Sequence, residues 1–523
     1  MNDRQNSLTR STLLLTAVGL VAQLLAFFYR VCLSRLVGAE TMGLYQLIMP
    51  VYSIFLSIAV TGLTVAISSL TASYDALGQH AAVRRILTLG FRGLVLLWMP
   101  IAMAVVLFSG PIASLLLGDE RTRLGLMLLL PVLLLTGVEN LTKHHFYGMG
   151  EVRLPAAVEL GEQFVRTAAV LGLVWFFLPE DPSVTVALIV LGMLISEVFS
   201  SSSLTLLRKR RERGRTYGRE ERPVTGLASQ MARVAIPVAA TALLGNLMAS
   251  ANSILIPRKL MAVGLTESEA MSQFGVVFGM TVPLLNLPSA FIGALCLAIV
   301  PRLSQCQAKK RERECREKIS KAILAASVIV LPATAFLVTL GPDLGELLFQ
   351  NETVGDHLLP LAVGVVLGSY ESVLASVLNG IGKQIWSAAV SLLCGALQLV
   401  FTVTGRGLDG FLIGLIVTSA LGVLLRYLLI ARRTGLRLNF FQAFSAPALG
   451  ALLSGLCVHL LYMAMGQQNS PMAVTLFCCT AIGLFLYLVT LWMMDVHPLQ
   501  LFHLTRRRVS RSARSTTRRT ENG

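Results

Sequence analysis

The chain has few charged residues for its length and lacks the motifs of common enzymes. Charged residues make up 14% of its 523 residues, hydrophobic residues make up 54%, and the mean hydropathy is +0.71. A soluble domain needs more surface charge than this. No GxxxxGK[ST], HExxH or GxSxG sequence occurs, so hydrolysis of ATP by this chain is not expected. We expect an integral membrane protein that is not an enzyme.

Cysteine and acidic residues are also sparse. The eight cysteines form no CxxC pair, so no disulfide framework, metal site or cofactor is expected. Acidic residues number 28 against 44 Lys and Arg, which gives a net charge of +16. The basic residues lie in short clusters such as residues 208–211, 309–311 and 506–508. Such clusters are typical of contact with anionic membrane lipids rather than with nucleic acid.

The feature present throughout is a series of about fourteen apolar stretches, each long enough to cross a bilayer as a helix. This predicts an all-α polytopic membrane protein. The predicted spans are residues 11–34, 45–72, 89–111, 124–146, 155–178, 184–207, 234–257, 272–300, 319–341, 357–379, 384–404, 409–430, 443–465 and 471–494.

The distribution of positive charge predicts the orientation. Most Lys and Arg residues lie in the tails and in alternate connections, which the positive-inside rule assigns to the cytoplasm. Both termini are therefore expected in the cytoplasm. Basic residues near the ends of spans, such as Arg426, are assigned to the membrane surface, and only Arg166 is expected well within a span. The first apolar stretch is long enough to span and has no obvious cleavage site, so it is expected to remain in the mature protein.

An internal repeat divides the chain. At an offset of 232 residues, Glu139 falls on Glu371 and Gly43 falls on Gly275. The offset carries the first six spans onto the next six, which predicts two lobes related by a pseudo-twofold axis along the membrane normal. We expect an N-lobe (1–207), a basic cytoplasmic linker (208–233), a C-lobe (234–430), two additional spans (431–495) and a basic cytoplasmic tail (496–523).

Three arginines near the outer ends of spans are candidate substrate-binding residues. Arg30 and Arg35 lie near the outer end of the first span, and Arg258 follows the seventh. A guanidinium binds phosphate through two parallel hydrogen bonds, so arginines at the mouth of a cavity would suit a diphosphate. The alternative is that these side chains extend to outer lipid headgroups.

Charged residues within the spans form a second group of candidates. Glu162, Gln163 and Arg166 lie along one helical face of the fifth span, where Glu162 and Arg166 are spaced for an ion pair. Glu139 and Glu371 occupy equivalent depths in the two lobes. These residues are predicted either to couple transport to a proton or sodium ion, or to lock neighbouring helices together.

Neutral polar residues in the spans have two interpretations. Asn252, Asn286 and Gln398 lie in the seventh, eighth and eleventh spans. Most such residues hydrogen-bond neighbouring helices. Asn252 and Asn286 are nevertheless retained as candidate substrate contacts, and Gln398 as part of an intramembrane polar network.

Several motifs resemble the stage V sporulation protein B group, in the polysaccharide-flippase branch of the multidrug/oligosaccharidyl-lipid/polysaccharide export superfamily. They are YR-x4-RL-x-G at residues 29–38, GLYQ-x3-P at 43–50, G-x3-AIS at 62–68 and GMG-x4-PA-x5-EQ-x2-R at 148–166. The stretch from residue 235 to residue 302 matches as well, so the resemblance covers nearly the whole chain. Where family members often have an acidic residue in the seventh span, this chain has Asn252 and its neighbours.

The resemblance implies a flippase of the bacterial cytoplasmic membrane that alternates between inward-open and outward-open states around a central cationic cavity. The implied substrate is a polyprenyl-pyrophosphate-linked saccharide or peptidoglycan precursor, with Arg30 and Arg35 as candidates for its pyrophosphate. A cation-coupled multidrug or metabolite antiporter of the same superfamily is the main alternative, and would favour an acidic, aromatic cavity. A membrane glycosyltransferase or polymerase is less favoured, because the predicted outer loops are short.

Overall fold

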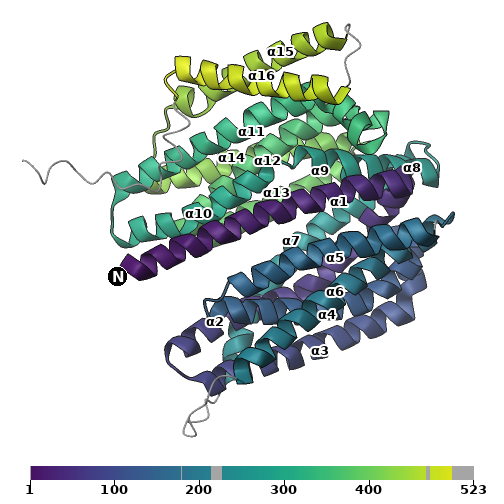
Figure 1. The fold of residues 1–523 in the computed structure, drawn as a ribbon, viewed down its shortest axis with the longest axis vertical. Coiled ribbons are helices and arrows are strands. Elements are labelled where there is room, and N and C mark those ends of the chain that lie inside the picture. The colour runs from purple at the N-terminus through teal and green to yellow at the C-terminus, as the bar shows by residue number, and fades with distance from the viewer. Residues whose placement is uncertain (1, 178, 214–225, 467–471, 497–523) are drawn as a thin grey trace, which may run out of the picture.

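The computed structural model describes residues 2–177, 179–213, 226–466 and 472–496 (Figure 1). These residues form helices and connections without a β-strand, which confirms the all-α prediction. The elements are α1 (Asn2–Leu56), η1 (Ser57–Thr61), α2 (Gly62–Ala76), α3 (His80–Pro111), η2 (Ile112–Leu117), η3 (Glu120–Thr122), α4 (Arg123–Gly148), α5 (Arg153–Phe177), α6 (Pro182–Arg213), α7 (Leu227–Ala262), α8 (Glu267–Gly275), η4 (Val276–Thr281), α9 (Val282–Leu285), α10 (Ser289–Ala308), α11 (Glu312–Phe349), η5 (Glu352–Gly355), α12 (Leu358–Gly380), α13 (Gln384–Thr404), α14 (Asp409–Thr434), η6 (Phe441–Ser445), α15 (Ala446–Gly466) and α16 (Met472–Met493).

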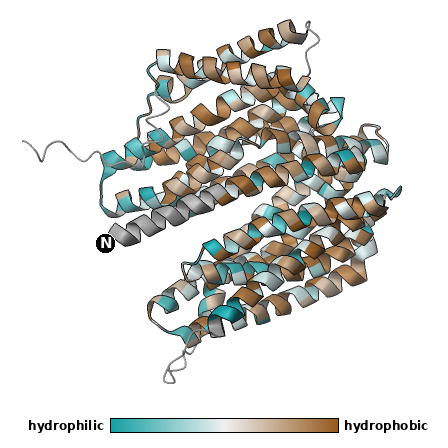
Figure 2. Cartoon of the chain, viewed as in Figure 1, coloured by the Kyte–Doolittle hydropathy of each residue, from teal (hydrophilic) through white to brown (hydrophobic). Residues whose placement is uncertain are grey.

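Within these residues, 13 helical segments are long and apolar enough to cross a membrane. The first, Val18–Ala76, has 59 residues, roughly twice the length that one bilayer crossing needs. It therefore holds two crossings, which brings the total to the predicted fourteen. Hydrophobic residues run along the helices, and hydrophilic residues collect toward their ends (Figure 2). The protein is a multi-pass membrane protein.

The connection between the first two spans differs from the prediction. The sequence pattern suggested a loop of about ten residues after residue 34, whereas the helix continues from α1 into α2 with one sharp break at Gly38. Gly38 has φ 76° and ψ 176°, a backbone conformation that residues with a Cβ rarely adopt. A single glycine thus separates the first two crossings. The eighth span is also broken, at residues 286–288 between α9 and α10.

The helices form the two predicted lobes. Helices α2–α6 make one group and α8–α14 the other, while α1 lies along the boundary between them (Figure 1). The additional helices α15 and α16 pack on the side of α11 that faces away from the rest of the bundle. Ser327 of α11 donates a hydrogen bond to the carbonyl of Ala443 at 2.7 Å, which ties the start of this addition to the C-lobe.

The two lobes meet at repeat-related glycines. A Cβ on Gly43 of α1 would lie 2.1 Å from the carbonyl oxygen of Met271, and a Cβ on Gly275 would lie 1.9 Å from that of Ala39. Gly43 matches Gly275 in the repeat, and Ala39 matches Met271. A contact in which each residue touches the other's equivalent is the mark of a twofold axis. The pseudo-twofold axis that relates the lobes therefore passes through this crossing.

The first helix of each lobe lies against the other lobe, but only one of these two contacts is closely packed. Helix α7 packs closely on α2, where a Cβ on Gly62 would lie 2.3 Å from the Ala235 carbonyl oxygen. The residue equivalent to Gly62 is Ala294 of α10. Ala294 faces α1 across a cavity instead of a close contact. The same position in the fold is thus closed in one lobe and open in the other.

Candidate functional site

The open position is a cavity of 550 Å³ between residues 19–30 of α1 and the segment from α9 to α10. Its walls are mainly apolar and small. The side chains that give it polar character are those of Gln23, Arg30, Asn286 and Ser289. Two candidate substrate residues, Arg30 and Asn286, therefore lie in the same cavity, although they are far apart in the sequence.

Arg30 is the charged residue of this lining. Its neighbour Tyr29 packs in the core and is 6% exposed, which fixes this turn of α1, while Arg30 itself is half-buried. No hydrogen bond or ion pair joins the Arg30 guanidinium to any other residue in the described part of the chain. An unpaired, always-charged group between membrane helices favours an anionic ligand in this cavity.

Asn286 lies at the break between α9 and α10. Its backbone N–H donates to the Val282 carbonyl at 2.9 Å, and its Oδ1 accepts a hydrogen bond from Ser289 Oγ at 3.2 Å. Pro288 between them has no N–H to donate. The amide of Asn286 therefore remains able to donate to a ligand beside Arg30.

Arg35 and Arg258 occupy a different kind of site. Arg35 of α1 donates from Nε to the Leu348 carbonyl at 2.6 Å and from Nη2 to the Leu347 carbonyl, at the end of α11. Arg258 of α7 donates from Nη2 to the Leu116 carbonyl at 2.7 Å and also to the Leu115 carbonyl.

These contacts follow the pseudo-symmetry of the lobes. The first helix of each lobe donates to free carbonyls at the C-terminal end of the third helix of the other lobe, where a cation also interacts favourably with the helix dipole. Arg35 and Arg258 thus hold the lobes together at the predicted outer end. Neither residue lines the Arg30 cavity.

A smaller cavity of 210 Å³ lies between α1, α7 and α8 near the pseudo-twofold axis. Its lining residues are uncharged, so the central cationic cavity implied by the resemblance is not present there. Asn246 Nδ2 donates to Ser57 Oγ at 2.6 Å, and Ser250 Oγ donates to the Pro50 carbonyl at 3.0 Å. These hydrogen bonds join α7 to residues 50–57 and so connect the two lobes beside this cavity.

Asn252 and Gln398 hydrogen-bond neighbouring helices. Asn252 of α7 accepts a hydrogen bond from Thr402 Oγ1 of α13 at 2.7 Å. Gln398 of α13 donates to the Phe411 carbonyl and accepts from Thr418 of α14, both at 3.0 Å. Both amides are at most 8% exposed, so they join α7, α13 and α14.

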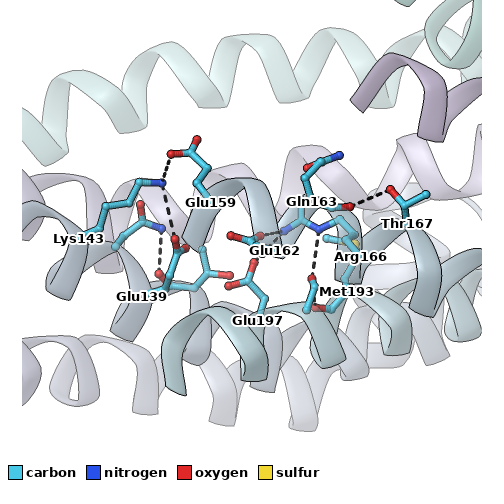
Figure 3. Close-up of polar contacts among 12 residues, drawn as sticks. Glu139, Lys143, Glu159, Glu162, Gln163, Arg166, Thr167, Met193 and Glu197 are labelled. Atoms are coloured by element: carbon cyan, nitrogen blue, oxygen red, sulfur yellow. Dashed lines mark hydrogen bonds and ion pairs between the residues drawn. The ribbon is translucent and has the colours of Figure 1, made fainter. Parts of the chain in front are cut away.

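A buried polar cluster joins α4, α5 and α6 in the N-lobe (Figure 3). Lys143 lies 3.6 Å from Glu139 and 3.0 Å from Glu159. Arg166 pairs with Glu162 on its own helix and, at 3.1 Å, with Glu197 of α6.

The cluster contains the ion pair that was predicted between Glu162 and Arg166. The pairing of Glu162 with Arg166 is present, and Arg166 also donates to Ser196 at 3.2 Å. Gln163 lies on the adjoining face, where its carbonyl accepts from Thr167 Oγ1 at 2.8 Å (Figure 3). Four carboxylates share two cations here, so the cluster has capacity for a further positive charge.

The C-lobe has a corresponding cluster around Glu371. Arg426 of α14 donates from Nη1 to Glu371 of α12 and from Nη2 to Ser391 of α13 at 2.6 Å. Arg426 is 3% exposed. The prediction that Arg166 is the only basic residue within a span was therefore wrong, because Arg426 lies inside the bundle rather than at a helix end.

A sequence model of the family described as "Polysaccharide biosynthesis protein" matches residues 8–307, more than half of the chain. The chain belongs to the polysaccharide biosynthesis protein family. A second family model, MatE, matches residues 259–404.

The chain is 23% identical over 431 residues to stage V sporulation protein B of Bacillus subtilis (strain 168), an alignment that covers 80% of this chain and 82% of the relative. It has the fold of a multidrug resistance MATE family transporter of the MOP superfamily in an inward-facing conformation, with a TM-score of 0.65, 15% identity, and coverage of 80% of this chain and 98% of that one.

The fold is also that of the lipid II flippase MurJ in an inward closed conformation, with a TM-score of 0.65, 9% identity, and coverage of 92% of this chain and 99% of that one. The chain thus shares its fold with both a MATE family transporter and a lipid II flippase. These two structural neighbours are a transporter and a flippase.

Two residues of the polar clusters were missed by sequence reasoning. Glu197 and Arg426 both lie within apolar stretches, and a charge in such a stretch is itself a signal of a buried partner. Glu197 is 2% exposed and pairs with Arg166. Among the described residues, every arginine named above except Arg30 has a hydrogen-bond or ion-pair partner.

Proposed function

We propose that this protein is a flippase for a polyprenyl-pyrophosphate-linked saccharide or peptidoglycan precursor, which it carries across the bacterial cytoplasmic membrane by alternating access. The observation that carries this proposal is the unpaired Arg30 guanidinium in a cavity between the lobes. A diphosphate headgroup leaves water during transit and needs cationic and hydrogen-bonding partners in a space of low dielectric constant. Arg30 and Asn286 supply both kinds of partner.

The shape of the cavity suits an amphiphile. It lies between α1 and α10 instead of on the pseudo-twofold axis, and its apolar wall includes Leu20, Phe27 and Leu297. Leu297 is 68% exposed, so the wall continues onto a surface that faces lipid. A prenyl chain can therefore remain in the bilayer while the headgroup occupies the cavity.

The moving units would be the lobes at residues 1–207 and 234–430, with residues 208–233 as the linker and both termini in the cytoplasm. Residues 431–495 would move with the C-lobe, on which α15 packs. Parts of the linker and the tail at 496–523 lie outside the described residues. The coupling ion, a proton or sodium, would act at the clusters around Glu139 and Glu371.

The second candidate function is that of a cation-coupled multidrug or metabolite antiporter. It is favoured by the match of residues 259–404 to the MatE family and by the likeness to a MATE transporter fold. The Arg30 cavity argues against it, because its lining includes an arginine and no carboxylate, and an organic cation would be repelled there.

Transport in proteoliposomes distinguishes the two functions. The purified protein would be reconstituted with a lipid-linked saccharide, with lipid II or with a fluorescent organic cation, and the amount reaching the opposite leaflet or the lumen would be followed. We expect transport of a lipid-linked substrate and none of the cation. Uptake of the cation without movement of either lipid-linked substrate would contradict the proposal and support the antiporter.

A further inference from the structure

A separate cavity of 740 Å³ lies at the end of the bundle where basic residues collect, between the first turns of α11 and the connection after α14. It shares no element with the Arg30 cavity. Four cationic side chains and one carboxylate line it, namely those of Arg313, Arg316, Lys321, Arg437 and Glu317.

The backbone of this cavity is held in place by the end of α14. Gly435 has φ 62°, and its N–H donates to the Ala431 carbonyl at 2.9 Å, which closes the helix with a left-handed residue. Arg316 Nη1 reaches across from α11 to the Thr434 carbonyl at 3.1 Å. Leu436 is 5% exposed and packs in the core cluster that contains Ile319. The backbone at Arg437 is therefore held beside α11.

The charges of the cavity do not cancel. Arg313 lies 3.4 Å from Glu317, and Arg316 is used by the Thr434 carbonyl. Lys321 and Arg437 have no acidic partner among the residues that the structure describes. Two free cations, reinforced by two more on the same wall, favour a ligand with a phosphate group.

Exposed aromatic residues place the cavity at the membrane surface. Phe440 and Phe441 are 67% and 53% exposed, and the apolar span Phe441–Met465 begins here. Aromatic side chains of this kind occupy the boundary between headgroups and hydrocarbon. Arg437 precedes them by three residues, so the cations lie at the depth of lipid phosphates.

We infer that this cavity binds the phosphate of an anionic phospholipid of the surrounding bilayer, such as phosphatidylglycerol. Basic pockets between transmembrane helices at this depth are suited to lipid headgroups. The lipid would connect α11 and α14 of the C-lobe at the point where the chain leaves for α15. The inference is independent of the flipped substrate, because the Arg30 cavity lies elsewhere.

Native mass spectrometry of the full-length protein in detergent, titrated with dioleoylphosphatidylglycerol, tests the inference. The variant K321Q/R437Q removes the two free cations of the cavity. The matched control is K309Q/K310Q, which removes two exposed lysines from the neighbouring α10–α11 connection. Each basic residue near an anionic surface contributes about 1 kcal/mol, so K321Q/R437Q should weaken the tightest binding step about 30-fold. The control variant should change this affinity little. Dioleoylphosphatidylcholine should bind equally well to the wild type and to both variants.

The inference is overturned if both variants lose phosphatidylglycerol equally, since the charges then act as a diffuse surface. It is also overturned if neither variant loses it. A parallel titration with inorganic phosphate separates the two sources of the anion. Tight binding of free phosphate that depends on Lys321 and Arg437 would assign the cavity to a soluble anion rather than a lipid. A normal elution volume and thermal unfolding temperature of both variants establish that they are folded.

Discussion

Gly43 and Gly275, which are 232 residues apart and equivalent in the internal repeat, lie against each other's helices where the two lobes cross. Neither position has room for a Cβ, because the opposing backbone carbonyl would be closer than van der Waals contact allows. The crossing lies at the same end of the bundle as the arginine contacts between lobes. Together these features hold the two lobes against each other at the predicted outer end.

Alanine at Gly43 or Gly275 should push the lobes apart at the outer end. Spin labels on cysteines placed at Glu120 of η3 and Glu352 of η5, in a background without the native cysteines, should show a longer mean distance in either variant. Gly245→Ala is the matched control, since nothing lies within 4 Å of a Cβ there. An unchanged distance in the Gly43→Ala and Gly275→Ala variants would mean that the crossing does not set the state of the outer end.

Loss of the arginine contacts should have the same direction of effect. Arg35→Ala and Arg258→Ala each free two carbonyls at the end of a helix in the other lobe. A hydrogen bond from a charged donor contributes about 1.5 to 3 kcal/mol, so each substitution should shift the population toward the open outer end by about tenfold or more. The same spin-label pair measures this, with Arg406→Ala as a control at an exposed position of the same face. A shift of equal size in the control would refute a specific role.

The Glu371–Arg426 pair should behave as a coupled unit in stability. Removing either partner leaves a buried charge alone, at a cost of about 3 to 5 kcal/mol. The double variant Glu371→Leu/Arg426→Leu should be less destabilised than the sum of the single leucine variants, as measured by chemical unfolding in detergent micelles. Additive losses would show that the two side chains do not interact.

Arg121 of η3 in the N-lobe lies 3.8 Å from Glu267 of α8 in the C-lobe, and this contact between the lobes should respond to pH. Burial and the neighbouring Asp119 carboxylate raise the pKa of Glu267, although Arg121 opposes this and Glu40 adds to it. A raised pKa means that the closed contact favours the protonated form, so a fall in pH through that pKa stabilises the closed outer end and a rise weakens it. Glu267→Gln should remove this dependence from the spin-label distances. A variant that titrates like the wild type would assign the pH response to another group.

Hydropathy predicted the helical spans, and the fixed-offset repeat predicted the two lobes, because both depend on residue patterns along single helices. The roles of the arginines could not be predicted in the same way. Arg35 and its acceptor Leu348 are 313 residues apart in sequence, and the acceptor is a backbone carbonyl, which has no signature in residue type. Arg30 differs from Arg35 only in what the folded chain places opposite it.

The break at Gly38 shows a further limit of the sequence pattern. Residues 35–44 contain polar side chains typical of a loop, yet they continue the helix because one glycine with positive φ suffices to redirect it. Arg426 was similarly assigned to a helix end by its position in the span. Its burial depends on Glu371 and Ser391 from two other helices.

The central claim is that Arg30 binds the diphosphate of a lipid-linked substrate. Its most direct test is leaflet-resolved transport by Arg30→Ala, Arg30→Lys and Arg406→Ala in proteoliposomes with equal protein content. Loss of a charge-assisted contact of about 1.5 to 3 kcal/mol should lower transport by Arg30→Ala at least tenfold, while lysine keeps the charge and part of the rate. Arg406→Ala should transport at the wild-type rate. Wild-type transport by Arg30→Ala would contradict the account.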